Sequence, residues 1–282
     1  MTAERLREQL VSIERQFQGR IAIDVRRLDK PGRFSMRERD VLPTASTCKL
    51  FVLCELFRQA EAGEVDLDSP VAARPEMWCP GAGVLRAMRL DESLSAYNMA
   101  VLMIALSDNV ATVALVDRLG ADRIEHTAHE WGFTETTLAQ GLASWTQTDG
   151  VGPTSNAYDL CLLLARIYRR EILNAASCEE ILKILRAQRC NEMLPRFIPI
   201  GEEWGVADEW IASKTGYNGC AVDTGIVHTQ HCTFSLAVFF RLNEYVKPRY
   251  KCLADHPRVV AVAEACRCIY EHYSANNRSN GR

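Results

Sequence analysis

A serine and a lysine stand three residues apart at the start of an apolar run, as Ser46-Thr47-Cys48-Lys49 followed by residues 50–57. Because residues at i and i+3 share one face of a helix, Lys49 would lie one turn along from Ser46. A serine hydroxyl is a weak nucleophile unless a base takes its proton. A lysine can act as that base when burial or a second cation lowers its pKa. The pair therefore indicates a serine nucleophile with a lysine base, although this spacing alone is common by chance.

Two further motifs follow in order, Ser107-Asp108-Asn109 and Lys214-Thr215-Gly216. The first is expected between two helices, and the second at the end of a strand, where Gly216 would let a substrate lie close to the backbone. Ser46 is expected at a helix N-terminus, where free backbone N–H groups favour developing negative charge. Taken singly, each motif has a plainer interpretation, such as helix caps or a surface charge.

Composition limits the classes of protein to consider. The chain has 282 residues, 48% apolar and 24% charged, enough to bury a sizeable core as one large domain or two small ones. A net charge of −3 and the lack of a basic stripe argue against a nucleic-acid partner. The N-terminal residues lack a secretory apolar stretch, and the longest apolar runs, such as 100–106, are too short to span a membrane. We therefore expect a cytoplasmic protein with no membrane partner.

Eleven cysteines is a high count for such a chain, but they contain no Cys-x-x-Cys pair. Without a secretion signal, we expect buried free thiols rather than disulfides or a structural metal site. His126 and His129 form His-x-x-His rather than the zinc-protease arrangement, and we expect them on a solvated helix face. The sequence predicts no metal and no other cofactor.

The predicted elements suggest one layer built from both ends of the chain. A helix over 2–17 precedes a hairpin whose strands cover 20–25 and 33–39, and β-rich stretches return at 210–214, 221–227 and 233–240. A last helix follows Pro257 to about Tyr273, whereas residues 44–205 contain helices and loops without a convincing strand. We predict an α/β sheet subdomain of residues 1–44 and 206–282, and an inserted all-helical lobe of residues 45–205 that carries Ser46 and Ser107. A cleft is expected where lobe and sheet meet.

The three motifs together resemble those of class A serine β-lactamases and penicillin-binding transpeptidases. The match extends to residues 81–85, 105–112 and 222–227, and the resemblance covers roughly residues 4 to 275. It implies an α/β (α+β) fold in which an antiparallel five-stranded sheet is flanked by terminal helices, with the helical lobe inserted.

The resemblance also implies catalytic roles. Ser46 would be the acylated nucleophile, Lys49 a base for acylation, and Ser107 a proton relay to the leaving nitrogen. The backbone N–H groups of Ser46 and Tyr217 would form an oxyanion hole, which supplies much of the transition-state stabilisation in acyl transfer.

Substrate-binding roles are implied in the same way. Asn109 would hold a substrate amide, and Lys214 and Thr215 would bind a substrate carboxylate beside Gly216. Large aromatic residues are further candidates for lining the pocket, although such residues are as readily explained as core: Trp78, Tyr97, Trp145 and Tyr217.

Two positions depart from the class A pattern. Counting without gaps, the glutamate that activates the deacylating water falls at Leu142, and residues 139–154 contain no glutamate. Asp149 is the only carboxylate there, either a replacement base or a turn residue before Gly150. In class A enzymes an arginine helps to hold the substrate carboxylate, and the matching position in this sequence is Ala221. Arg241 lies on the following strand.

These departures leave several functions open. Acylation needs Ser46, a base and an oxyanion hole, whereas fast deacylation needs an activated water, which is typically worth ~10²–10⁴-fold in rate. The sequence therefore predicts a serine hydrolase or acyltransferase acting on a small amide, β-lactam or ester, with weak or atypical β-lactamase activity. A non-catalytic ligand-binding or regulatory protein that retains the fold is the alternative. Covalent labelling of Ser46 would distinguish the two, and the oligomeric state stays open.

Overall fold

Five antiparallel strands form one sheet in the computed structural model, which describes residues 2–89, 93–145, 152–200, 208–244 and 253–278. Their order is β2-β1-β9-β8-β7. The strands are β1 (Gly19–Arg27), β2 (Arg33–Met36), β7 (Trp210–Asn218), β8 (Cys220–His228) and β9 (Thr233–Leu242). Because β1 pairs along its whole length with β9, the two ends of the chain share one sheet. The predicted five-stranded antiparallel sheet is confirmed.

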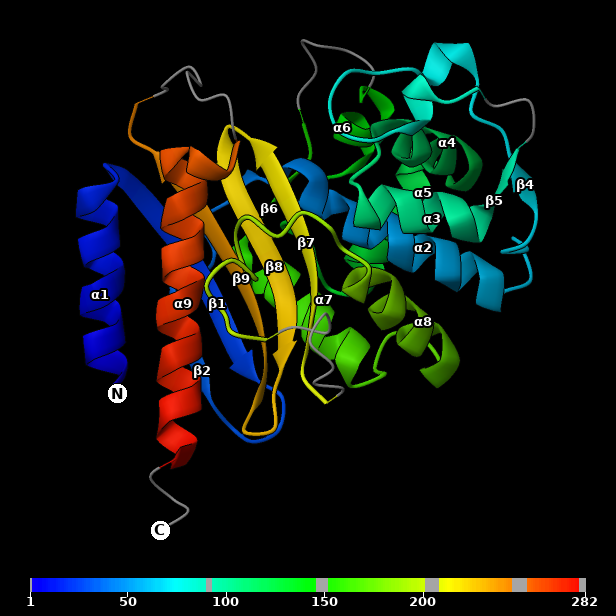
Figure 1. Cartoon of the computed structure of the whole chain (residues 1–282). Coiled ribbons are helices and arrows are strands. Elements are labelled where there is room, and N and C mark those ends of the chain that lie inside the picture. Colours follow the sequence, from blue (N-terminus) through cyan, green and yellow to red (C-terminus); the bar gives the residue numbers. More distant parts are fainter. Residues whose placement is uncertain (1, 90–92, 146–151, 201–207, 245–252, 279–282) are drawn as a thin grey trace.

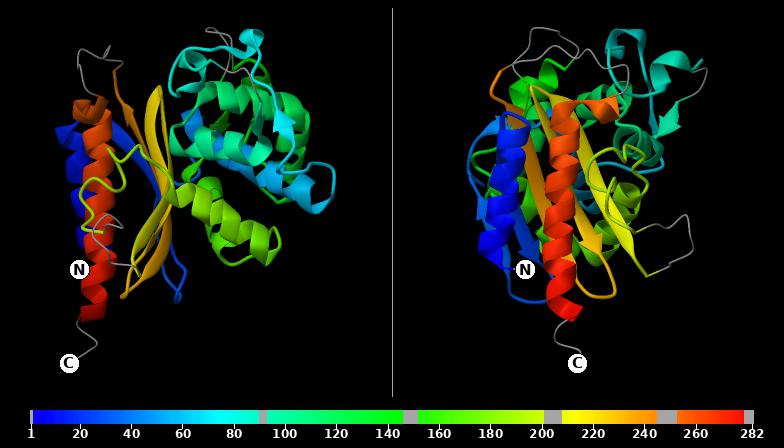
Figure 2. Two further views of the ribbon diagram at one scale, coloured as in Figure 1. Left: turned by 45° about the vertical axis from the view of Figure 1, so that its right-hand side comes forward. Right: turned by 60° about the vertical axis from the view of Figure 1, so that its left-hand side comes forward.

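Two terminal helices cover one face of this sheet, and the lobe covers the other (Figures 1 and 2). The helices are α1 (Ala3–Gln16) and α9 (Pro257–Arg278), and α9 continues past its predicted end near Tyr273. The buried side of α1 follows a helical spacing and consists of Leu6, Leu10 and Ile13. None of the described helices, α9 included, is both long and apolar enough to cross a membrane.

The strands bury both of their faces. Ile23 of β1 and its partner Val238 of β9 belong to the core beneath the terminal helices, whereas the neighbouring pair Ala22 and Phe239 belongs to the core beneath the lobe. Successive residues of a strand point to opposite faces, so each strand supplies both cores. For this reason β8 is buried almost throughout, its polar Asp223 and Thr224 included, without the alternation in burial expected of a half-exposed strand.

The lobe between these strands is largely helical. Its helices are α2 (Lys49–Glu61), α3 (Ala96–Ala105), α4 (Asn109–Leu119), α5 (Ala121–Glu130), α6 (Ala139–Ala143), α7 (Ala157–Tyr168) and α8 (Ala175–Arg186). Helix α2 is buried on nearly all sides, from Leu50 to Phe57, and therefore forms the centre of the lobe core.

The prediction of an all-helical lobe was wrong in detail. Two short β-ladders lie in or at the border of the lobe: β3 (Leu42–Pro43) pairs with β6 (Thr154–Ser155), and β4 (Pro70–Val71) pairs with β5 (Leu94–Ser95). Strands of two residues are too short to show a two-residue period, so the sequence carries no sign of them. The first ladder also crosses the proposed border at residues 44 and 45, and the domain division stays a prediction.

A second correction concerns the Lys214-Thr215-Gly216 motif. It was predicted at the end of a strand that begins at Trp210, but β7 continues to Asn218. Glycine weakens a strand interior and usually signals its end. Here β7 continues because it is paired with β8 through Gly216 to the turn at Gly219.

The double-sided core predicts a large cost for truncating Phe239, which is fully buried in β9 against the lobe. We expect Phe239→Ala to lower the free energy of unfolding by about 3–5 kcal/mol through lost burial and an unfilled cavity. Denaturant unfolding measures this loss in the free energy of unfolding. As a control, Phe197→Ala removes a ring that is 37% exposed, and should cost less than about 1 kcal/mol. Equal costs for the two variants would contradict this assignment of the core.

Candidate active site

Ser46 lies in a short 3-10 helix, η1 (Ala45–Cys48), that leads directly into α2. Thr47 holds this turn together, because its backbone N–H and its hydroxyl both donate to the carbonyl oxygen of Thr44, at 3.1 and 2.8 Å. The serine therefore sits immediately before a helix, and its position is fixed by local hydrogen bonds.

Lys49 is the first residue of α2 and is fully buried. Its Nζ donates to the backbone oxygen of Ser107 at 2.7 Å, to Ser107 Oγ at 3.2 Å and to Asn109 Oδ1 at 2.8 Å. Burial and, after it, the nearby charge of Lys214 lower the pKa of Lys49 well below its usual value. A neutral amine keeps a lone pair, so Lys49 can take a proton from a hydroxyl.

Ser107 joins the lobe to the sheet. It lies between α3 and α4 with φ of 54°, a left-handed conformation that is rare for serine and common at functional sites. Its Oγ accepts hydrogen bonds from Lys49 Nζ at 3.2 Å and from Lys214 Nζ at 3.1 Å. One hydroxyl thus bridges a lysine of the lobe and a lysine of the sheet.

Asp108, the middle residue of this motif, has a structural role. Its Oδ1 accepts from the backbone N–H of Ala111 at 3.0 Å and so caps α4, while its Oδ2 accepts from Val84 and Leu85 at 2.6 and 2.9 Å. A Cβ on Gly83 would lie 2.2 Å from this Oδ2, which is why only glycine fits there. The cap interpretation therefore applies to Asp108 and not to Ser107.

Asn109 has both ends of its side-chain amide in use. Its Oδ1 accepts from Lys49, and its Nδ2 donates to the backbone oxygen of Pro80 at 2.9 Å. Its backbone N–H also donates to the oxygen of Ala82, at 3.1 Å. These bonds fix the amide at the edge of the site, where it lines a pocket.

Lys214 is fully buried on β7, and its Nζ donates to Ser107 Oγ and to the backbone oxygen of Thr215 at 2.9 Å. Burial lowers the pKa of Lys214 to about 8. Thr215 is also buried, and it pairs across the sheet with Asp223. By strand alternation, its side chain lies on the face opposite to Lys214. The carboxylate-binding role of Thr215 stays a prediction.

Gly216 is the point of closest approach between the sheet and the serine. A Cβ there would lie 2.7 Å from Thr44 O and 3.0 Å from Ser46 N. The free edge of β7 therefore packs directly against η1, and a side chain at position 216 would displace the serine turn. The absence of a side chain thus makes room for the serine turn, and the predicted part of Gly216 in substrate binding stays a prediction.

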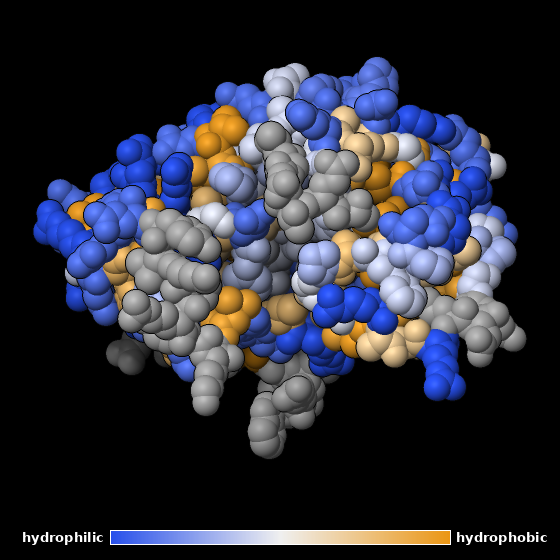
Figure 3. Space-filling view, turned by 90° about the horizontal axis from the view of Figure 1, so that it is seen from above, coloured by the Kyte–Doolittle hydropathy of each residue, from blue (hydrophilic) through white to orange (hydrophobic). Residues whose placement is uncertain are grey.

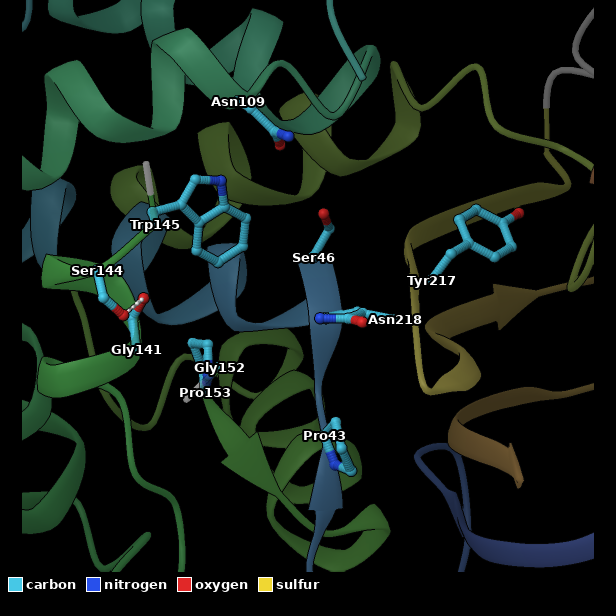
Figure 4. A pocket seen from close by; sticks show the side chains of 11 residues that line it. Pro43, Ser46, Asn109, Gly141, Ser144, Trp145, Gly152, Pro153, Tyr217 and Asn218 are labelled. Carbon is cyan, nitrogen blue, oxygen red and sulfur yellow. Dashed lines mark hydrogen bonds between the residues drawn. The ribbon is translucent and has the colours of Figure 1, made fainter. Parts of the chain in front are cut away.

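A pocket of about 240 Å³ opens above Ser46. In Figure 4, the Ser46 hydroxyl, the Asn109 amide and the Trp145 indole point toward one space, whereas the Tyr217 ring turns away from it. Any part of Tyr217 in chemistry at Ser46 would thus be played by its backbone. Seen from above, the surface of the molecule has a hollow near its middle, and both hydrophilic and hydrophobic residues surround it (Figure 3). The lining consists of Pro43, Ala45, Ser46, Asn109, Gly141, Ser144, Trp145, Gly152, Pro153, Tyr217 and Asn218.

The predicted residues thus fall into two layers. Ser46, Asn109 and Tyr217 line the pocket, while Lys49 and Lys214 lie buried and both donate to Ser107, and Thr215 is buried on β7. Of the other aromatic candidates, only Trp145 joins the lining, since Trp78 is 51% exposed elsewhere and the Tyr97 hydroxyl bonds Glu180 on α8.

The position counted for the deacylating glutamate does not face the pocket. Leu142 is buried in the lobe core, whereas Gly141, Ser144 and Trp145 line the pocket, as expected for neighbours at i, i+3 and i+4. Asp149 lies outside the described residues. The described lining contains no carboxylate.

The second departure from the class A pattern, alanine in place of arginine at position 221, lies in the sheet. Ala221 is fully buried in the core beneath the terminal helices, so no cation projects from that position. Arg241 is exposed on β9 and is not among the lining residues. Lys214, unlike Arg241, is in contact with a predicted site residue, since its Nζ donates to Ser107 Oγ.

The expectation of free thiols is confirmed for the ten cysteines that the structure describes, nine of which are buried. Burial raises the pKa of Cys48, between the serine and the lysine, to about 12, so this thiol stays protonated near neutral pH. The described part of the chain contains no group of three or more His, Cys, Asp or Glu side chains that could hold a metal ion.

Sequence reasoning missed several lining residues. Asn218, Ser144 and Pro153 stand at the pocket because a strand end, a helix end and a short ladder meet there. Only Asn218 carried a usable signal, since it stands two residues after the end of the third motif. The other two are brought in by tertiary contacts alone.

Comparison with known proteins supports the interpretation of this site. A family model described as the beta-lactamase enzyme family matches residues 5–273. The beta-lactamase regulatory protein BlaB from Streptomyces cacaoi is 27% identical over 108 residues, which cover 38% of this chain. The matched segment spans only 35% of that relative's length.

Two solved structures superpose on nearly the whole chain. A beta-lactamase from Sphaerobacter thermophilus has a TM-score of 0.83 at 22% identity, with 96% of each chain covered, and shows the shared fold. A leucine-to-glutamate mutant of PBP-A, solved as an acyl-enzyme complex with penicillin G, has a TM-score of 0.81 at 26% identity, again with 96% of each chain covered.

The contact at Gly216 generates a test of the site. We expect Gly216→Ala to lower the reactivity of Ser46 toward a fluorophosphonate probe by roughly tenfold or more, because the new Cβ displaces the serine turn. Gly32→Ala is the matched control, since its Cβ would meet only the flexible side chain of Arg27. Labelling followed by mass spectrometry measures both variants. Unchanged labelling of Gly216→Ala would contradict the packing of β7 against the serine.

Proposed function

The chain belongs to the beta-lactamase enzyme family, and we propose that it is a serine hydrolase or acyltransferase that forms an acyl-Ser46 intermediate on a small amide, lactam or ester. The observation that carries this proposal is the buried, low-pKa Lys49 one turn from Ser46, in contact with Ser107. Burying a charged lysine without an acidic partner costs free energy, whereas a neutral lysine avoids that cost and can act as a base.

Acylation follows from this arrangement. Ser46 Oγ attacks the substrate carbonyl carbon, and its proton passes to the neutral Lys49 amine. The backbone N–H groups of Ser46 and Tyr217 stabilise the negative charge on the oxygen. Ser107, held by both lysines, then delivers a proton to the leaving nitrogen or oxygen. Asn109 and Lys214 orient the substrate.

Deacylation by water should be the slow step. The described lining contains no carboxylate to activate a water, and Leu142 lies in the core. General-base assistance is typically worth ~10²–10⁴-fold, so β-lactams would be trapped or turned over weakly. The PBP-A mutant that was solved as a penicillin G acyl-enzyme supports the expectation that this fold can hold such an adduct.

A second candidate is a ligand-binding regulator without turnover. The similarity to a beta-lactamase regulatory protein favours it, although that similarity covers little more than a third of this chain. A protein that only binds ligand has no need for a buried lysine base beside a pocket serine, and we therefore rank catalysis first.

Intact-protein mass spectrometry tests the proposal directly. After incubation with a penicillin, a cephalosporin and a simple activated ester, we expect an acyl adduct that persists on the wild type and is absent from Ser46→Ala. Loss of substrate without an adduct, again requiring Ser46, would show hydrolysis with rapid deacylation. No labelling and no turnover with any of the three compounds would favour the regulatory protein.

The lysine pair predicts a pH dependence. The charge of Lys214 lowers the pKa of Lys49, so Lys214→Gln should raise that pKa. The rise in acylation rate with pH would then move to higher pH, by about one unit or more, and neutral-pH acylation would slow. Stopped-flow acylation by a neutral ester measures the shift. Lys214→Arg keeps the charge and should keep the wild-type midpoint. Superimposable profiles of Lys214→Gln and wild type would refute the role of Lys49 as base.

A further inference from the structure

Trp145 forms one side of the pocket at Ser46. Its indole lies beside Ser46 in Figure 4, and Lys49 Nζ is 5.3 Å from the ring centroid. Around Lys49, the described hydrogen-bond partners are Ser107 and Asn109, and the aromatic ring closes the pocket side. A molecule bound on this side of the pocket would therefore face the flat surface of an indole.

The described neighbours of Trp145 carry no carboxylate that could act as a base. Gly141 has no space for a side chain, because a Cβ there would lie 2.4 Å from Pro153 N. Ser144 bonds back to the oxygen of Gly141 at 3.5 Å and offers only a hydroxyl. Leu142 points into the lobe core. Lys49 is thus available as base to water and to an alcohol alike, and an aromatic alcohol gains in addition its packing against the indole.

The same lining suits a small neutral molecule with a flat body. Rings and aliphatic surface come from Trp145, Pro43 and Pro153, and the polar groups are the uncharged Asn218 and Ser144. No described lining residue carries a charged side chain. A volume of about 240 Å³ admits one ring rather than an extended molecule. A charged acceptor would lose its hydration here without gaining a partner.

We propose, building on the function proposed above, that the acyl group leaves Ser46 by transfer to a neutral aromatic alcohol that stacks on Trp145. The alcohol oxygen bonds to the acyl carbon as the bond from that carbon to Ser46 Oγ breaks. The alcohol proton moves to the neutral amine of Lys49 and then to Ser46 Oγ, which restores the free serine. The product is an ester, and no oxidant or further reactant is needed.

The test partitions one acyl-enzyme between water and alcohol. With 4-nitrophenyl phenylacetate as donor, we expect wild type to form mainly the benzyl ester from millimolar benzyl alcohol, and at least roughly tenfold less ester from 4-(hydroxymethyl)benzoate, which differs by one charge. Trp145→Ala should lower the ratio of ester to phenylacetate by roughly tenfold. Trp145→Phe should restore most of that ratio. Trp78→Ala, an exposed tryptophan outside the lining, is the matched control and should behave as wild type.

The outcomes distinguish a failure of this inference from a failure of the proposed function on which it rests. An acyl-Ser46 adduct that yields only phenylacetate, or an unchanged ratio in Trp145→Ala, would overturn the aromatic acceptor and leave the serine hydrolase standing. Equal use of the neutral and charged alcohols would overturn the role of the uncharged lining. No acyl-Ser46 adduct from this donor would overturn the proposed function, and the acceptor with it.

Discussion

Two buried lysines share one serine hydroxyl, and the arrangement of the site depends on that contact. Lys49 comes from the lobe and Lys214 from the sheet, and both donate to Ser107 Oγ. Burial lowers the pKa of both amines, and the charge of Lys214 lowers that of Lys49 further, so the neutral amine becomes accessible. The chemistry of the site thus comes from the way lobe and sheet pack together.

The sheet keeps this contact in place because its strands are buried on both faces. Terminal helices cover one face and the lobe covers the other. This packing on both faces fixes the position of the edge strand β7 beside η1. Gly216 then brings the backbone of β7 against Ser46. A side chain at that position would push the strand and the serine turn apart.

The pocket itself points away from ordinary β-lactam hydrolysis. A family that contains beta-lactamases here presents an uncharged lining, a buried alanine at position 221 and a tryptophan beside the lysine. The described lining therefore agrees with the function proposed above, in which an acyl-enzyme that lacks a carboxylate to activate water is transferred or hydrolysed slowly.

The sequence by itself determined the motifs, their order and the elements that carry them, because these depend on local periodicity and on short spacings. It therefore predicted the five-stranded sheet and named Ser46, Lys49, Ser107 and Lys214. Only the tertiary structure decided which side chains face the pocket. Counting residues placed the missing glutamate at Leu142, but α6 turns that position into the core and Trp145 toward the serine. A shift of one residue rotates a helical side chain by about 100°, which no count along the chain can resolve without knowing the helix and its packing.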